Sequence, residues 1–138
     1  MAIRFFSEGI NFHLSGPRNT ITWIKHVIKK EGRKLHSLNY VFCSDEYLIK
    51  LNDQYLKHKS LTDILTFDYS TDPRSIHGEV YISIQRVREN ATRFQESFDD
   101  ELHRVIIHGV LHLTGYNDKS ATDKAIMREK EEAYLSLR

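Results

Sequence analysis

The sequence predicts an α+β protein in which a small mixed four-stranded sheet packs with about five helices. Strand-like and helix-like segments follow one another in mixed order along the chain. The 138 residues include 40% hydrophobic and 11% aromatic side chains, which is enough for a real core and argues against intrinsic disorder. The length suits one domain spanning residues 1–138.

The first half of the chain is expected to alternate strand and helix. Apolar side chains recur at helical spacing before Gly32, which predicts a helix that ends at this glycine. Ser44 precedes an acidic pair and predicts the N-cap of a second helix. The expected elements are strands at residues 3–6 and 38–43 and helices at residues 20–31 and 45–55.

The second half begins with two expected strands, at residues 64–69 and 79–83. The polar segment between them, residues 68–77, is predicted to be a loop. A helix is expected at residues 84–94. Ser97 and Ser120 predict the N-caps of two more helices, the first ending at Gly115 and the second running through Leu135.

Composition excludes several classes of protein. The net charge is +1, with an excess of five positive charges in residues 1–60 and of four negative charges beyond them. This polarity allows an anionic partner on one side without requiring one. Cys43 is the single cysteine, so the chain forms no internal disulfide, which indicates a reducing cytoplasm. No apolar stretch approaches the roughly 18 residues of a membrane span, and membrane and secreted proteins are therefore not expected.

One segment carries the pattern of a metal site. His108 and His112 are four residues apart on a predicted helix, so their rings lie on one face about one turn apart. Gly115 then reverses the chain, and Asp118 is the carboxylate best placed to return as a third ligand. Two histidines and one carboxylate, with a position open for water, are typical of a catalytic metal site.

The same spacing also fits two core or surface histidines without a metal. Two observations favour the metal. The helix is otherwise strongly apolar, and two unpaired imidazoles would be costly to bury there. Gly109 lies inside the helix at a cost of about 1 kcal/mol relative to Ala, which suggests that something approaches closely at this point.

The segment HGVLHLTGYND resembles HGxLHLxGYDH, the signature of the YbeY-type metallo-endoribonucleases. Further blocks are similar to the family's LNxxY, TDVLSF and GDIxIS motifs and to its M…E…L ending, and they begin at residues 51, 62, 78 and 127. The resemblance covers residues 40–138. It implies a zincin-like metal site on a helix followed by a Gly turn.

The resemblance also implies which residues bind the metal. The family's ligands are three histidines, at the positions of His108, His112 and Asp118. Zinc is therefore the expected ion, one per chain. The aspartate adds a negative charge, which should weaken the Lewis acidity of the ion and raise the pKa of its water. It also opens the choice of divalent metal, because two histidines plus a carboxylate serve non-haem iron.

Besides Asp118, the sequence departs from the family's pattern at a position that concerns the substrate. The family places an arginine after the tyrosine of LNxxY, at a position thought to contact an RNA phosphate, and this position is Leu56 here. Lys57 or Lys59 is expected to supply the missing charge, although both also fit solvated loop residues. The general base is not identified. Asp63 is a candidate, and its alternative role is a buried cap to a neighbouring turn. His58 and His77, in predicted loops, could approach the site.

The implied function is a metal-dependent, single-strand-directed endoribonuclease that matures ribosomal RNA at the 16S 3′ end and serves ribosome quality control. The implied partners are ribosomal RNA and the small ribosomal subunit, without DNA or membrane. Two alternatives stay open: an RNA-binding assembly factor with weak or lost cleavage, and a metallopeptidase-like hydrolase. Gly109 occupies the position of the peptidase glutamate in HExxH, which argues against a protease of that type.

Overall fold

The computed structural model describes residues 2–56 and 62–138, and its four strands form one mixed sheet in the order β1-β2-β4-β3. The strands are β1 (Ile3–Glu8), β2 (Lys34–Cys43), β3 (Ile64–Asp68) and β4 (Ser75–Ser83). β1, β2 and β4 run parallel, and β3 pairs antiparallel with β4. The expected α+β class is confirmed.

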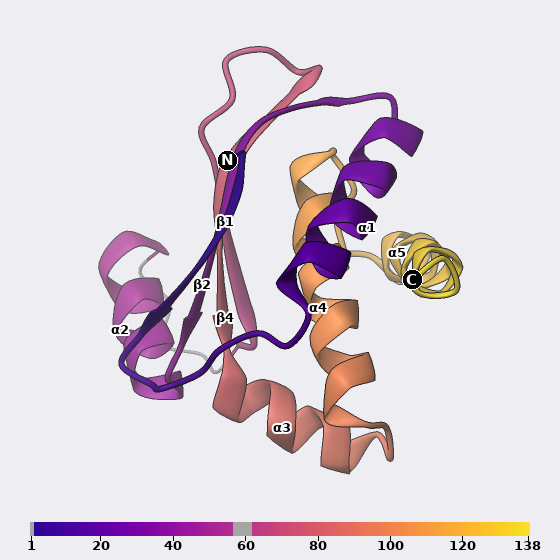
Figure 1. Ribbon diagram of the computed structural model, residues 1–138. Helices are drawn as coiled ribbons and strands as arrows, with labels where there is room; N and C mark the ends of the chain where they lie inside the picture. The colour runs from indigo at the N-terminus through magenta and orange to yellow at the C-terminus, as the bar shows by residue number, and fades with distance from the viewer. Residues whose placement is uncertain (1, 57–61) are drawn as a thin grey trace.

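The described part of the chain forms five helices, four of which lie in layers on the two faces of the sheet, while the one at Ile84–Arg93 follows the end of β4 (Figure 1). They are α1 (Pro17–Lys30), α2 (Asp45–Leu56), α3 (Ile84–Arg93), α4 (Phe98–Leu113) and α5 (Ala121–Leu135). Figure 1 shows α1 and α4 on one face of the sheet, α2 on the other, and α5 beyond α4. α4 is thus the central helix, with the sheet on one side and α5 on the other.

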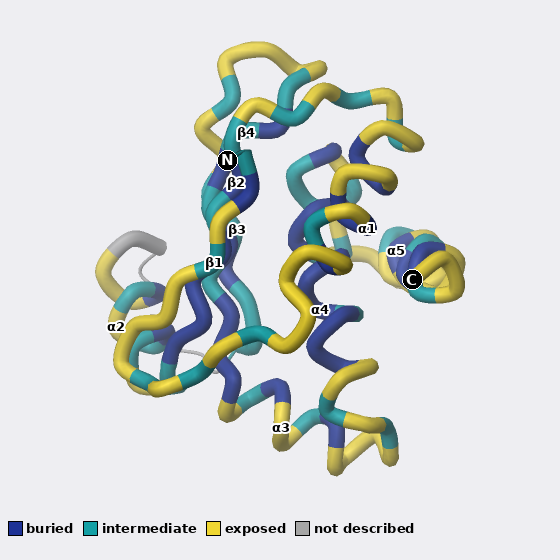
Figure 2. The backbone as a smooth tube through the Cα atoms, in the orientation of Figure 1, coloured by how far each residue is buried: buried dark blue, intermediate teal, exposed yellow. Residues whose placement is uncertain are grey.

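The main core fills the space between the sheet and the helix pair α1 and α4, where Figure 2 shows buried backbone on the facing elements. Alternate residues of β2 point into it, and Leu38, Tyr40 and Phe42 are all at most 1% exposed. A smaller cluster lies under α2 and includes Cys43, Leu48 and Leu65. Cys43 is fully buried there, as expected for a small apolar side chain.

Several predicted boundaries were wrong. α1 begins at Pro17 instead of residue 20, because proline is well tolerated in the first turn of a helix. β2 and β4 begin at Lys34 and Ser75, so residues 75–77 of the expected loop belong to the sheet. Their added residues pair with one another and alternate between inward and half-exposed positions. Ser75 and His77 alternate with the buried Ile76 and point away from the main core, and composition alone suggested a loop.

Two glycines allow α4 to lie close to the sheet. A Cβ atom at Gly109 would stand 2.9 Å from Cγ1 of Val80 on β4 and 3.2 Å from Cδ1 of Ile64 on β3. A Cβ atom at Gly78 would stand 2.5 Å from the carbonyl oxygen of Phe67 and 3.1 Å from Cδ2 of Leu113 on α4. The close approach that Gly109 indicated is therefore the contact between helix and sheet.

No helix within residues 2–56 or 62–138 is both long and apolar enough to cross a membrane.

We expect Gly78→Ala to destabilise the protein more than Gly109→Ala. At Gly78 the new methyl group meets a backbone oxygen that cannot move alone, so we expect a loss of about 2 kcal/mol or more, within the range for overpacked cores. At Gly109 the gain in helix propensity, about 1 kcal/mol, offsets part of the clash with Val80. Urea unfolding of the two variants measures both changes, and the reverse order would contradict this account of the packing.

Candidate active site

The two histidines of the predicted metal site lie in the last turns of α4. Ser97 caps this helix, and its hydroxyl accepts a hydrogen bond from the backbone N–H of Asp100 at 3.0 Å. The helical spacing of four residues brings the rings of His108 and His112 together, with centroids 4.5 Å apart and planes at 82°. Both side chains are mostly buried, with 18% and 24% of their surface exposed.

The Gly turn returns Asp118 to these rings. Gly115 has a φ of 108°, which L side chains rarely adopt, and the chain reverses there as expected. Oδ2 of Asp118 lies 3.4 Å from Nε2 of His108 and 3.6 Å from Nε2 of His112. The donor atoms of all three residues lie within 4.8 Å of one another, so this group could hold a metal ion. Across residues 2–56 and 62–138, no fourth such side chain joins the group.

The remaining ring nitrogens are held by acceptors, which leaves Nε2 of each ring for the shared centre. Nδ1 of His108 lies 2.6 Å from Oε2 of Glu131 on α5, and Nδ1 of His112 lies 3.1 Å from the carbonyl oxygen of Tyr116. A proton on each Nδ1 satisfies these acceptors and leaves the Nε2 lone pairs directed toward Asp118. This is the usual arrangement around metal-binding histidines, and the residues present therefore fit a metal ion.

The surroundings shift the pKa values of the two histidine rings in opposite directions. Burial opposes protonation of His108, but the Glu131 carboxylate outweighs burial and raises the pKa of the ring. Burial and the neighbouring His108 lower the pKa of His112, which favours the neutral ring that a metal requires.

The loop that carries Asp118 is anchored to the rest of the fold through Tyr116. Its hydroxyl donates a hydrogen bond to Oε1 of Glu31, just beyond α1, at 2.8 Å. Glu31 also accepts hydrogen bonds from Tyr134 and Lys130 of α5. Three parts of the chain thus fix the turn between the second histidine and the aspartate.

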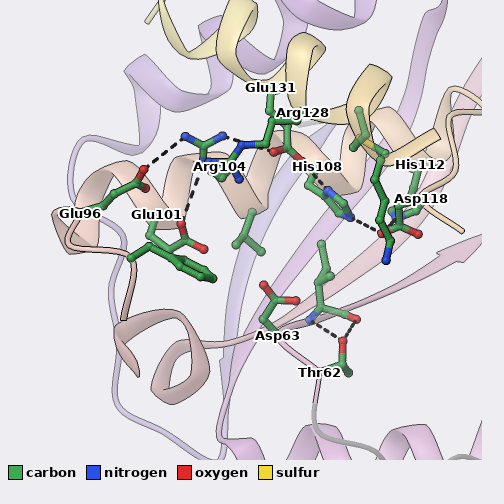
Figure 3. A pocket seen from close by; sticks show the side chains of 15 residues that line it. Thr62, Asp63, Glu96, Glu101, Arg104, His108, His112, Asp118, Arg128 and Glu131 are labelled. Atoms are coloured by element: carbon green, nitrogen blue, oxygen red, sulfur yellow. Dashed lines mark hydrogen bonds and ion pairs between the residues drawn. The ribbon is translucent and has the colours of Figure 1, made fainter. Parts of the chain in front are cut away.

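The candidate ligands line a cavity of about 500 Å³, which Figure 3 shows between α4, α5 and the start of β3. Asp63 lies on the β3 wall, and its carboxylate faces the same cavity as His108. Its backbone carbonyl accepts a hydrogen bond from Ser83 at 3.0 Å. Burial raises the pKa of the Asp63 carboxyl, while the nearby His108 opposes this shift.

Arg104, Glu96 and Glu101 line the part of the cavity away from Asp118 (Figure 3). The Arg104 side chain is only 11% exposed and forms ion pairs at 2.7 to 3.8 Å with four residues: Glu132, Glu131, Glu96 and Glu101. Buried charges of this kind require such partners. On α5, Lys124 and Arg128 also line the cavity, and neither side chain has an ion-pair or hydrogen-bond partner within the described residues.

Other predicted residues lie elsewhere. Lys57, His58 and Lys59 fall outside the described residues. His77 does not approach the site, because it lies on β4 with its ring stacked on His36 at 4.7 Å. Sequence reasoning missed Arg104, Lys124 and Arg128 as lining residues and gave Glu131 no role beyond its place in the M…E…L ending. The i, i+4 spacing of Lys124 and Arg128 was the one signal available for them.

The stability that Glu101→Gln gains over wild type should increase as the pH rises. Burial raises the pKa of Glu101 to about 7 from an ordinary value of 4.5. The folded protein therefore keeps this proton longer than the unfolded chain, and wild-type stability falls between about pH 4.5 and 7. We expect Glu101→Gln to gain on the order of 2 kcal/mol over wild type across this range. Chemical unfolding at several pH values measures the gain.

The matched control is Glu132→Gln, which removes a carboxylate that is 56% exposed from the same arginine. The stability of this variant relative to wild type should show no comparable rise with pH. A stability difference between Glu101→Gln and wild type that stays constant from pH 4 to pH 8 would contradict the burial of a charge at this position.

Comparison with known proteins agrees with the motifs. The family model described as Endoribonuclease YbeY matches residues 11–137. The chain is 49% identical over 133 residues to a protein named Endoribonuclease YbeY from Amoebophilus asiaticus, covering 96% of this chain and 90% of that one. A protein of the same name from Bacteroides thetaiotaomicron is 45% identical over the full length of both chains.

A solved structure supports the fold as well. The solution structure of a Thermotoga maritima protein is similar with a TM-score of 0.67 and 32% sequence identity, covering 97% of this chain and 87% of that one. The resemblance noted from the motifs is thereby confirmed over nearly the whole chain. This chain belongs to the endoribonuclease YbeY family.

Proposed function

We propose that this chain is a metal-dependent endoribonuclease that hydrolyses single-stranded RNA in the cavity between α4, α5 and β3. Family membership supports the endoribonuclease role. The observation that carries the metal dependence is the convergence of two Nε2 atoms and one carboxylate oxygen, with each Nδ1 held by an acceptor. His108, His112 and Asp118 would hold one divalent ion, for which we propose zinc.

A divalent ion bound there supplies Lewis acidity toward a phosphoryl oxygen and lowers the pKa of a water molecule that it holds. Asp63 is the proposed general base, since its carboxylate faces the ligands across the cavity and makes no hydrogen bond to a neighbouring turn within the described residues. Hydrolysis joins a water oxygen to phosphorus and breaks one phosphorus–oxygen ester bond. The water proton passes to Asp63, and the leaving ribose oxygen takes a proton from solvent.

Four cations are proposed to contact the phosphates. Lys124 and Arg128 line the cavity wall, where their exposed charges attract a polyanion. Lys57 and Lys59 precede Thr62, a lining residue of the cavity at the start of the described range 62–138, and they remain candidates to replace the arginine absent at Leu56. A lysine does so as a point charge, without the two-pronged contact of arginine.

Ribosomal RNA is the proposed substrate and the small ribosomal subunit the proposed partner, in maturation of the 16S 3′ end and in ribosome quality control, within the cytoplasm. This assignment rests on the family alone. The metallopeptidase alternative is disfavoured, because the position of the peptidase glutamate is Gly109, packed directly against Val80 and Ile64 of the sheet.

Removing a ligand or its support should weaken metal binding in a graded way. We expect the purified chain to bind one Zn²⁺, His112→Ala to lose this binding, and Asp118→Ala to weaken it. Glu131→Gln should weaken it about 10- to 100-fold, because Glu131 orients His108 without being a ligand. Titration calorimetry with Zn²⁺ and metal analysis measure these changes. Glu46→Gln, at an exposed carboxylate on α2, is the control.

Unchanged Zn²⁺ content in Asp118→Ala would remove Asp118 from the ligand set.

Asp63→Asn should separate catalysis from metal binding. We expect it to bind Zn²⁺ normally and to lower kcat for single-stranded RNA by about 100-fold or more, the usual contribution of a general base. Cleavage of labelled single-stranded RNA, duplex RNA and casein by the metal-loaded chain supplies the measurement.

Lys57→Ala combined with Lys59→Ala should raise KM for single-stranded RNA, and a parent-like KM would exclude both lysines from the site.

If the metal-loaded chain binds single-stranded RNA but never cuts it, the assembly-factor alternative replaces the proposed activity. Cleavage of casein in place of RNA would favour the hydrolase alternative.

A further inference from the structure

One end of the cavity holds hydrogen-bond acceptors that have no donors. Glu96 and Glu101 lie there, on the opposite side of Figure 3 from His112 and Asp118. Oε1 of Glu101 and Oε2 of Glu96 are both buried and accept no hydrogen bond. The Glu101 side chain is only 5% exposed. A buried carboxylate without hydrogen bonds is unfavourable, so a ligand that donates to it would be stabilised there.

Arg104 balances the charge of these glutamates without filling their acceptors. Its hydrogen bonds run to Glu132 at 2.7 Å and to Glu131 at 3.4 Å. It approaches Glu96 and Glu101 only to 3.6 and 3.8 Å, too far for hydrogen bonds. This end of the cavity therefore offers acceptors to a donating group, and it repels phosphate.

An exposed aromatic ring borders the same end. Phe94 follows α3, lines the cavity and is 55% exposed, which is unusual for so large an apolar side chain. It makes no ring contact with any described residue. Val105 and Met127 add apolar surface nearby. An aromatic face beside buried acceptors suits a flat, uncharged ring with N–H groups on its edge, which is the chemistry of a nucleobase.

We propose that this end of the cavity is a guanine subsite, in which Phe94 stacks on the base while Glu101 and Glu96 accept hydrogen bonds from its N1–H and N2–H₂ groups. Guanine is the RNA base that presents two adjacent donors on its Watson–Crick edge. Adenine and cytosine place an acceptor beside their amino group, and uracil flanks its single N–H with two carbonyl oxygens. The subsite rests on the proposed RNA cleavage and gives it a base preference.

The test compares oligouridylates that carry one central guanosine, inosine or adenosine, at pH 8, where Glu101 is ionised. Inosine keeps N1–H but lacks the N2 amino group. We expect the metal-loaded wild type to cleave the guanosine oligonucleotide roughly 10-fold or more faster, in kcat/KM, than the other two. Glu101→Gln should abolish this preference by lowering cleavage of the guanosine oligonucleotide to the level of the other two. Phe94→Leu should raise KM for all three.

Glu132→Gln is the matched control, because it removes a carboxylate of the same Arg104 that does not line this cavity. It should keep the guanosine preference. A merely structural role of Glu101 would lower cleavage of all three oligonucleotides together. That result, or equal cleavage of all three by the wild type, would overturn the subsite, as would a second Zn²⁺ bound by the wild type and lost in Glu101→Gln.

Binding of the same oligonucleotides, followed by fluorescence anisotropy, keeps the two proposals separate. If the wild type cuts none of them, the proposed function fails. The subsite then stands if the guanosine oligonucleotide binds more tightly than the inosine one and Glu101→Gln removes the difference, and it falls if all three bind alike.

Discussion

The contact between α4 and the sheet at Gly109 sets the geometry on which the site depends. Without a side chain at this position, the helix backbone reaches Val80 of β4 and Ile64 of β3. His108 immediately precedes this glycine, and Asp63 immediately precedes Ile64. A single close contact therefore fixes the distance between the helix that carries the candidate ligands and the strand that carries the candidate base. Packed interiors resist small displacements, so this spacing is held firmly.

Charge balance in the interior ties the site to distant parts of the chain. Glu131 of α5 contacts both His108 and Arg104, so it supports a candidate ligand and neutralises a buried cation at once. Glu31 joins Tyr116 in the Gly turn to α5. Because buried charges are costly unless paired, these contacts favour one arrangement of α4, α5 and the turn over others. The same pairing leaves Oε1 of Glu101 without a hydrogen-bond donor. A buried acceptor in this state lowers the stability of the protein unless a ligand donates a hydrogen bond to it.

Sequence predicted the local parts of this architecture. His108, His112 and Asp118 span eleven residues, and their convergence follows from one helical turn and one positive-φ glycine. Glu101 and Arg104 are neighbours on α4, but Glu131 reaches Arg104 and His108 only when α5 packs on α4, and no spacing within the chain indicates that contact. The starts of β2 and β4 were missed because their residues are largely polar, and strand pairing outweighs composition there.

The arrangement of the cavity bears on why an enzyme with this site would need unpaired RNA. In a duplex, the Watson–Crick edge of guanine already donates its N1–H and N2–H₂ hydrogen bonds to cytosine. A base can reach the acceptors of Glu101 and Glu96 only after it has left a helix, and it can stack on Phe94 only when its own neighbours do not cover it. Extruding a paired base costs a few kcal/mol, which a base that is already single-stranded does not incur. Selection for single strands would then follow from burial of the acceptors, without any surface that recognises the shape of a duplex.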